Sequence, residues 1–215
     1  MKLTIIVFMI TSMVFAPSTG RLNSQNAETS IYEDRITGTI TNLTTGDSYQ
    51  IPVVASTHQI GVNKFQTEYI AEIPHSVLTS SSEKSDEDPT LSARVYILQN
   101  YDHAVYGGLD YVRVNYYKGK WERLDSQVSC TRLDIKASVF GEVYGGGQIN
   151  KSETNTVNNP ANNMYYTETP SWAGQYVSIN DTYLQRGTST VYLLRGVTSW
   201  SFSVNVCQGG SFGVC

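Results

Sequence analysis

This chain of 215 residues has few of the side chains that build metal centres and nucleophilic catalytic sites. It contains only three cysteines and three histidines, and it has no His-Glu-x-x-His motif and no glycine-rich phosphate-binding loop. The 15 lysines and arginines are outnumbered by 19 aspartates and glutamates, and they form no basic stripe. The sequence therefore predicts no bound cofactor and no nucleic-acid partner.

The chain also lacks any stretch with the spacing of an amphipathic helix over three turns. It has 15 tyrosines but only six phenylalanines, and it is rich in serine, threonine, asparagine and glycine. Apolar and polar residues alternate in many short segments separated by turn residues, which is typical of strands with one wet face. We expect an antiparallel all-β fold, a two-sheet sandwich with a barrel-like arrangement as the alternative.

The first twenty residues have the pattern of a secretory signal peptide. A lysine precedes an apolar run over residues 3–15, which Pro17 ends, and Ser18 and Gly20 supply small residues before a cleavage site. The run is shorter than the roughly 20 apolar residues of a membrane span, although an uncleaved anchor is the alternative. We therefore expect residues 1–20 to be removed and the protein to be secreted, with no stable membrane span.

The rest of the chain is predicted to form a flexible arm and one domain. The arm covers residues 21–34, and the domain covers residues 35–215. Its parts are an N-terminal hairpin and strand (35–78), an acidic loop (79–90) and a main body (91–215). Within the body, Lys118-Gly119-Lys120 has the composition of a tight hairpin turn. Residues 145–172 are predicted to form a long polar loop.

The three cysteines are the candidates for a disulfide bond, since paired cysteines of a secreted chain are usually oxidised. Strand alternation places Cys207 on a polar face, and it places Cys130 on the outward face with Asp134. Cys130 could pair with Cys207 if their strands are neighbours. Cys207 could instead pair with Cys215, and Cys130 with Cys215 is the third arrangement. Any pairing leaves one cysteine unpaired, which could link two copies into a dimer.

A metal site is only weakly indicated. A hard cation such as Ca²⁺ is coordinated by several oxygen ligands, and a zinc site needs at least three converging side chains. The weak candidates are Asp86, Asp88, Asp102, His103 and Asp110. A charged loop around the first two, and a hairpin loop around the others, are the simpler interpretations.

Tyrosines gather in three places that could form a binding surface, because exposed aromatic rings with a polar edge are common in such surfaces. The candidates for this surface are Tyr116, Tyr117, Tyr165, Tyr166 and Trp172. A third series consists of Tyr101, Tyr106 and Tyr111. Packing within a sheet is the competing explanation for all of them.

The sequence favours a non-enzymatic binding or structural protein at the cell surface or in the medium, with an extracellular protein or a carbohydrate as its partner. A secreted hydrolase that uses two carboxylates is the first alternative. A pore-forming or bacteriocin-like protein is the second, because long amphipathic strands can assemble into membrane barrels. A hydrolase requires two facing acids in a cleft, whereas a binding protein requires an aromatic patch.

Overall fold

The structure is a computed structural model in which nearly all of the regular secondary structure is β-strand. It describes residues 36–79, 91–180 and 182–209. The predicted signal peptide, the flexible arm, residues 80–90 of the acidic loop, and Cys215 lie outside these ranges. The one helix of the described residues is a single turn, α1 (His75–Leu78). No helix in these ranges is long and apolar enough to cross a membrane.

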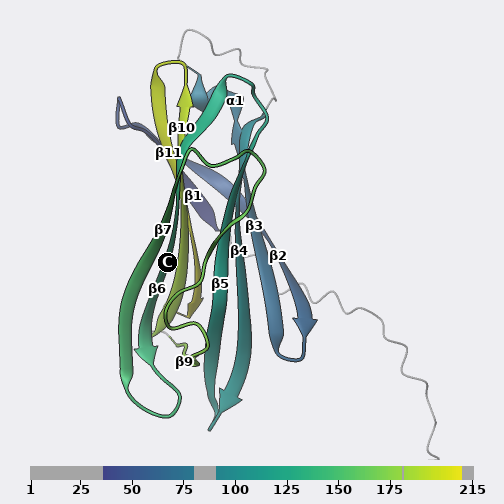
Figure 1. Cartoon of the computed structure of the whole chain (residues 1–215), viewed down its shortest axis with the longest axis vertical. Coiled ribbons are helices and arrows are strands. Elements are labelled where there is room, and N and C mark those ends of the chain that lie inside the picture. The colour runs from purple at the N-terminus through teal and green to yellow at the C-terminus, as the bar shows by residue number, and fades with distance from the viewer. Residues whose placement is uncertain (1–35, 80–90, 181, 210–215) are drawn as a thin grey trace, which may run out of the picture.

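Eleven antiparallel strands form one sheet (Figure 1). They are β1 (Thr37–Asn42), β2 (Ser48–Gly61), β3 (Lys64–Pro74), β4 (Leu91–Tyr106), β5 (Leu109–Arg123), β6 (Val128–Glu142), β7 (Gln148–Asn158), β8 (Tyr166–Glu168), β9 (Val177–Ser178), β10 (Leu184–Arg195) and β11 (Thr198–Gly209). Their order in the sheet is β7-β6-β10-β11-β1-β2-β3-β4-β5-β8, and β9 also pairs with β5. The predicted antiparallel all-β fold is confirmed, but the strands belong to one sheet rather than to two.

The sheet curls until its two halves meet face to face, as glycines in two strands show. A Cβ atom on Gly119 of β5 would lie 2.9 Å from Ile135 of β6. Likewise, a Cβ atom on Gly187 of β10 would lie 2.3 Å from the ring of Tyr117 of β5. Strands from opposite halves of the sheet are therefore packed against each other, so the barrel-like alternative describes the fold better than the sandwich does.

Side chains link the two ends of this sheet across the seam between β7 and the segment around β8. The carboxylate of Glu153 accepts a hydrogen bond from the backbone N–H of Ser171 at 2.8 Å. The side-chain amide of Asn155 donates to the backbone carbonyl of Thr167 at 2.9 Å. The sheet is thus nearly closed, with side-chain hydrogen bonds in place of a backbone ladder at the seam.

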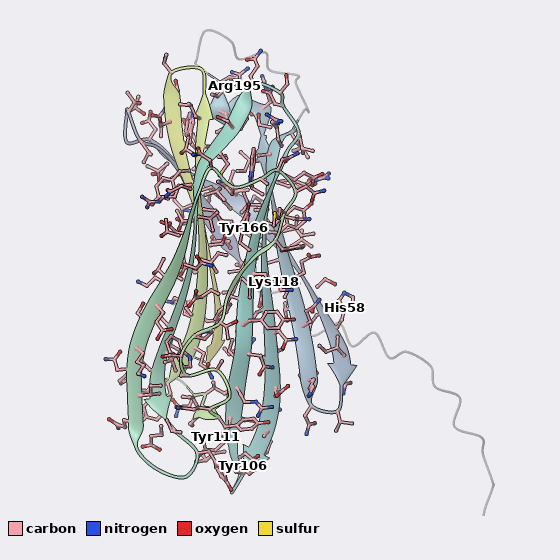
Figure 2. The ribbon with its side chains drawn as sticks, in the orientation of Figure 1. His58, Tyr106, Tyr111, Lys118, Tyr166 and Arg195 are labelled. Carbon is pink, nitrogen blue, oxygen red and sulfur yellow. The ribbon has the colours of Figure 1, made fainter. Side chains whose placement is uncertain are left out.

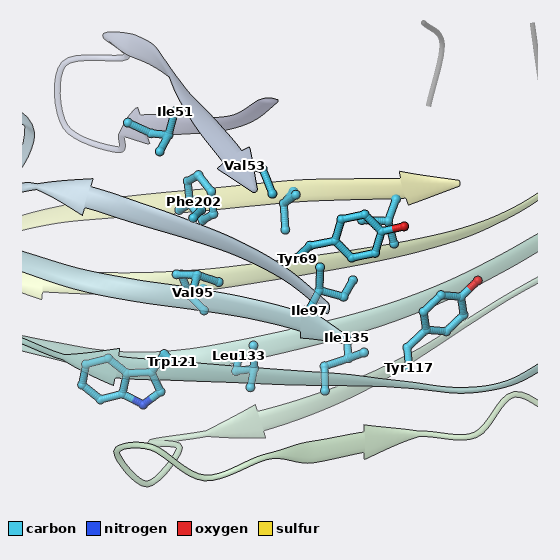
Figure 3. Close-up of a cluster of buried hydrophobic side chains, with 14 of the residues drawn as sticks. Ile51, Val53, Tyr69, Val95, Ile97, Tyr117, Trp121, Leu133, Ile135 and Phe202 are labelled. Carbon is cyan, nitrogen blue, oxygen red and sulfur yellow. The ribbon is translucent and has the colours of Figure 1, made fainter. Parts of the chain in front are cut away.

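The core fills the space inside the curled sheet with alternate residues of the long strands (Figure 3). In β6 the buried residues are Leu133, Ile135, Ala137 and Val139. In β11 they are Trp200, Phe202, Val204 and Val206. Both sets have the period of two that the sequence alternation predicted, because successive side chains of a strand point to opposite faces.

Two predicted connections are wrong because the residues belong to strands. Lys118-Gly119-Lys120 lies inside β5, where Gly119 is needed for the close approach of Ile135 rather than for a turn. The predicted loop 145–172 contains the whole of β7, which pairs with β6 along its length. The sequence of β7 lacks a clear apolar alternation because the strand lies at the end of the sheet and its surface is largely exposed.

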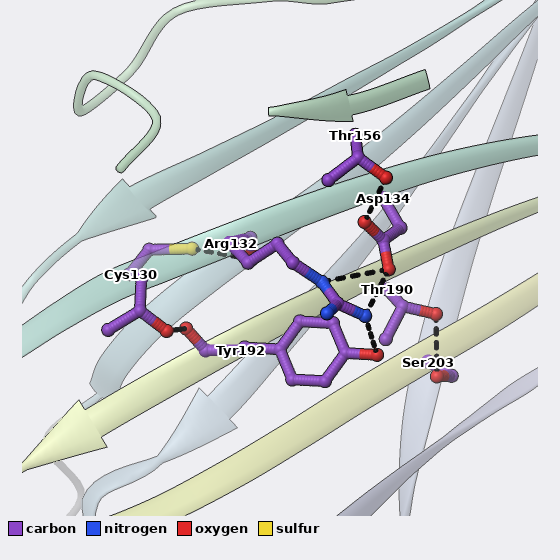
Figure 4. A network of polar contacts seen from close by, with 8 residues as sticks. Cys130, Arg132, Asp134, Thr156, Thr190, Tyr192 and Ser203 are labelled. Carbon is purple, nitrogen blue, oxygen red and sulfur yellow. Dashed lines mark hydrogen bonds and ion pairs between the residues drawn. The ribbon is translucent and has the colours of Figure 1, made fainter. Parts of the chain in front are cut away.

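Cys130 lies in the core, contrary to the prediction that it faces outward. Arg132 pairs with Tyr192 and Cys130 pairs with Leu193, so the intervening Thr131 has no partner of its own in β10. This β-bulge reverses the alternation and turns Cys130 inward, where its thiol donates to the backbone carbonyl of Arg132 at 3.2 Å (Figure 4). Burial raises the pKa of this thiol to about 11.

Two of the three disulfide arrangements that the sequence left open, Cys130–Cys207 and Cys130–Cys215, are wrong, since Cys130 is a free cysteine. The topology explains why Cys130 and Cys207 do not pair. Cys130 lies in β6 and Cys207 in β11, and β10 separates the two strands. Along β10 their partners are Leu193 and Arg186, which are far apart in the register. Pairing of Cys207 with Cys215 stays a prediction, because Cys215 is outside the described residues.

Candidate functional site

Four tyrosines from three segments meet at the end of the molecule where the β4–β5 and β6–β7 hairpins turn, and Figure 2 labels two of them, Tyr106 and Tyr111. We call this cluster, Tyr106, Tyr111, Tyr144 and Tyr176, the tyrosine end. Tyr106 stacks on Tyr144, with ring centroids 4.0 Å apart. Three more ring pairs meet edge to face, at centroid distances of 5.7 Å for Tyr106–Tyr111, 5.8 Å for Tyr106–Tyr176 and 5.6 Å for Tyr111–Tyr144. Such contacts fix the rings relative to one another.

Two glycine turns bring these tyrosines together. Gly107 and Gly108 both have positive φ, 59° and 82°, as a two-residue hairpin turn with matching strand twist requires. Ala104 pairs with Tyr111, so Tyr106, two residues further along, lies diagonally opposite Tyr111 on the same face. The hairpin therefore sets the first two rings side by side.

The second turn positions Tyr144. It contains Gly145, Gly146 and Gly147, all with positive φ between 92° and 110°. The backbone N–H of Tyr144 donates to the carbonyl of Tyr176 at 2.9 Å, which ties the two ring-bearing segments together. No Cβ atoms stand on this turn, so a ligand can approach its backbone closely.

An ion pair supports the cluster. The guanidinium of Arg113 lies 4.9 Å from the ring centroid of Tyr176, and its Nε donates to Asp102 Oδ2 at 2.9 Å. A second guanidinium nitrogen donates to the same oxygen. The hydrogen bond to Asp102 raises the pKa of Arg113. Because the Asp102 side chain is only 3% exposed, this pair joins the tyrosine end to the body of the sheet.

An open cavity of about 500 Å³ lies beside the tyrosine end. It is lined by Tyr111, Tyr144, Glu142, Gln148, Val143 and the turn 145–147. Glu142 accepts a hydrogen bond from the hydroxyl of Tyr183 at 3.1 Å, which raises the pKa of that tyrosine. The cavity thus combines aromatic rings with a carboxylate, a side-chain amide and glycine backbone.

Comparison with known protein families, curated proteins and solved structures finds no match to this chain.

The predicted aromatic surface is in part buried. Tyr117 and Trp172 are each 1% exposed and belong to the core, so neither can contact a partner. Trp172 follows a polar stretch beside a proline, which favours exposure, but its side chain packs in the hydrophobic core. The half-buried remainder, Tyr116, Tyr165 and Tyr166, lies away from the cavity: none of the three lines it.

Those three tyrosines have structural partners. Lys118 lies 4.9 Å from the ring centroid of Tyr116. The hydroxyl of Tyr166 accepts from the backbone N–H of Ala161 at 2.8 Å. The hydroxyl of Tyr165 donates to Glu68 of β3. The series Tyr101, Tyr106 and Tyr111 was the better indicator, since two of its members belong to the tyrosine end.

The weak metal candidates do not converge. Asp102 is paired with Arg113, while His103, on the opposite face of β4, lies 2.9 Å from Asp110. Among the described residues no three histidines, cysteines, aspartates or glutamates are grouped as metal ligands. The other two candidates, Asp86 and Asp88, lie outside the described residues.

Two carboxylates interact at the seam, Glu153 of β7 and Glu168 of β8. Burial, followed by the charge of Glu153, raises the pKa of Glu168. Hydrogen bonds from Ser171 lower the pKa of Glu153. Two acids whose pKa values move apart are a typical acid–base arrangement, but neither of these acids lines the cavity.

Proposed function

We propose that this chain is a secreted, non-enzymatic binding protein that holds a carbohydrate at the tyrosine end. Export is supported by the apolar run and small residues of its first twenty positions. The observation that carries the proposal is the cavity where Tyr111 and Tyr144 stand beside Glu142, Gln148 and a glycine turn.

Sugar rings match these groups chemically. A pyranose has an apolar face of C–H groups that can pack on an aromatic ring, and a rim of hydroxyls that needs hydrogen-bond partners. Tyr144 offers an accessible ring, 52% exposed, and Glu142 and Gln148 offer an acceptor and an amide at its edge. Ligand sites generally combine apolar walls with a few well-placed polar groups in this way.

A hydrolase is the second candidate, and the paired carboxylates Glu153 and Glu168 are the observation that favours it. Binding is the stronger proposal because this pair lies outside the cavity, where Glu142 is the one carboxylate among the described lining residues. Replacement of Glu168 by glutamine would abolish glycoside hydrolysis by the hydrolase and would leave saccharide binding at the tyrosine end unchanged.

A glycan array followed by calorimetric titration tests the binding proposal. The wild type should bind at least one class of saccharide, with a dissociation constant on the order of 1 mM for a short oligomer. Tyr144→Ala should weaken this binding about tenfold, as removal of a central aromatic contact does. Tyr49→Ala is the matched control, because Tyr49 is 41% exposed on β2 and lies outside the cluster. Equal affinity of the two variants would refute the proposed site.

A further inference from the structure

We infer that the saccharide held at the tyrosine end carries a protonated amine, so that the ligand is an amino sugar. This inference rests on the proposed function and specifies its ligand. It comes from a comparison of the cavity with a second tyrosine pair in the same molecule, where the chain supplies an ammonium group of its own.

That second pair is formed by Tyr96 of β4 and Tyr165, which meet edge to face at a centroid distance of 6.5 Å and an angle of 71°. The ammonium of Lys120 lies 3.7 Å from the first ring centroid and 4.7 Å from the second. Tyr96 donates to Glu122 at 2.6 Å, and Tyr165 donates to Glu68. Two perpendicular rings with carboxylates close by therefore hold a cation, as the negative faces of aromatic rings favour.

The cavity has a similar ring pair and a carboxylate, although this carboxylate accepts a hydrogen bond from Tyr183 rather than from either ring of the pair. Tyr111 and Tyr144 meet edge to face at 5.6 Å and 80°, and Glu142 lines the same cavity. No lysine or arginine is among the described residues that line it. Arg113, the guanidinium that supports the tyrosine end, lies over the ring of Tyr176, which does not line the cavity, and is paired with Asp102.

The cavity therefore presents two tyrosine rings and the carboxylate of Glu142, and none of its described lining residues carries a compensating positive charge. A neutral sugar would use the rings and the hydrogen-bonding groups, whereas an amino sugar would also use the charge of Glu142. Because Glu142 is exposed, the additional attraction is modest and sensitive to salt.

Titration with three oligosaccharides of equal length tests this inference: a glucosamine oligomer with free amines, its N-acetylated form, and a glucose oligomer. The free-amine oligomer should bind about fivefold to tenfold more tightly than the other two. Glu142→Gln should remove this preference while leaving binding of the neutral oligomers within about twofold. Glu72→Gln, at an exposed carboxylate of β3, should retain the preference.

The outcomes separate the two proposals. Equal or weaker binding of the free-amine oligomer, with binding of the neutral oligomers still dependent on Tyr144, would overturn the amino-sugar inference and keep the carbohydrate proposal. Failure of all three oligomers to bind at 10 mM, which is about ten times the expected dissociation constant, would overturn both.

Discussion

Replacement of Arg113 by methionine should strongly destabilise the protein, because it leaves a buried carboxylate without its partner. Asp102 is 3% exposed, its Oδ2 accepts from two guanidinium nitrogens, and its Oδ1 has no hydrogen-bond partner among the described residues. Breaking a buried ion pair on one side costs about 3–5 kcal/mol. For a chain of this length that corresponds to a decrease in Tm of roughly 10 °C.

Urea unfolding followed by tryptophan fluorescence measures this cost. Arg94→Met is the matched control, because Arg94 forms an exposed ion pair with Glu72 at 2.8 Å that should be worth about 0–1 kcal/mol. The double variant Arg113→Met/Asp102→Asn should be more stable than Arg113→Met alone, since no buried charge is left unpaired. Equal losses for Arg113→Met and Arg94→Met would refute the argument that Asp102 depends on this pair.

Three further predictions concern the sheet. Gly187→Ala should lower the free energy of unfolding by about 1–3 kcal/mol, because its Cβ atom would lie 2.3 Å from Tyr117. Gly61→Ala is the control: its Cβ atom would have no contact under 3.5 Å, so it should be neutral in the same urea titration. Cys130, with its pKa raised to about 11, should resist alkylation at pH 8 in the folded protein and react only on unfolding. The intact mass of the protein measures this labelling. Fast labelling of the native protein would show that the thiol is not buried. Glu153 has a lowered pKa, so its contribution to stability is present above pH 4.5 and is lost as the pH falls through the lowered value. The difference in unfolding midpoint between wild type and Glu153→Gln should therefore shrink below pH 4.5. A difference that stays constant with pH would contradict this.

The strands that could be predicted from the sequence are those with one buried and one wet face. In β6 and β11, apolar side chains recur at every second residue, so the period alone identified the strand and its core face. The β1–β2 hairpin was also predicted, since Thr45-Gly46-Asp47 supplies the turn and strands flank it on both sides.

Features that depend on distant parts of the chain could not be predicted in this way. Gly119 has the neighbours of a turn glycine, but its role comes from Ile135 on the facing strand. The bulge at Thr131 moved Cys130 into the core, and no local pattern marks an extra residue in a ladder. Trp172 is buried by tertiary packing rather than by its polar neighbours.

Only two of the four tyrosines of the candidate site could be grouped from the sequence, for the same reason. Tyr106 and Tyr111 flank a Gly-Gly turn, so their proximity follows from a hairpin. Tyr144 and Tyr176 join them through a backbone hydrogen bond between segments 32 residues apart. The run of three glycines that follows Tyr144 was the available signal, because consecutive glycines often mark places where a backbone or a ligand approaches closely.

The most direct test of the tyrosine end is an NMR titration of the isotopically labelled protein with a glucosamine oligosaccharide. The largest amide shifts should fall on Tyr144 and on the glycine turn 145–147, with smaller shifts at Tyr111. The amides around Tyr165, where Lys120 already occupies the ring pair, should stay unchanged. Largest shifts at Tyr165, or no shifts at the glycine turn when the saccharide is saturating, would show that the saccharide does not bind at the tyrosine end.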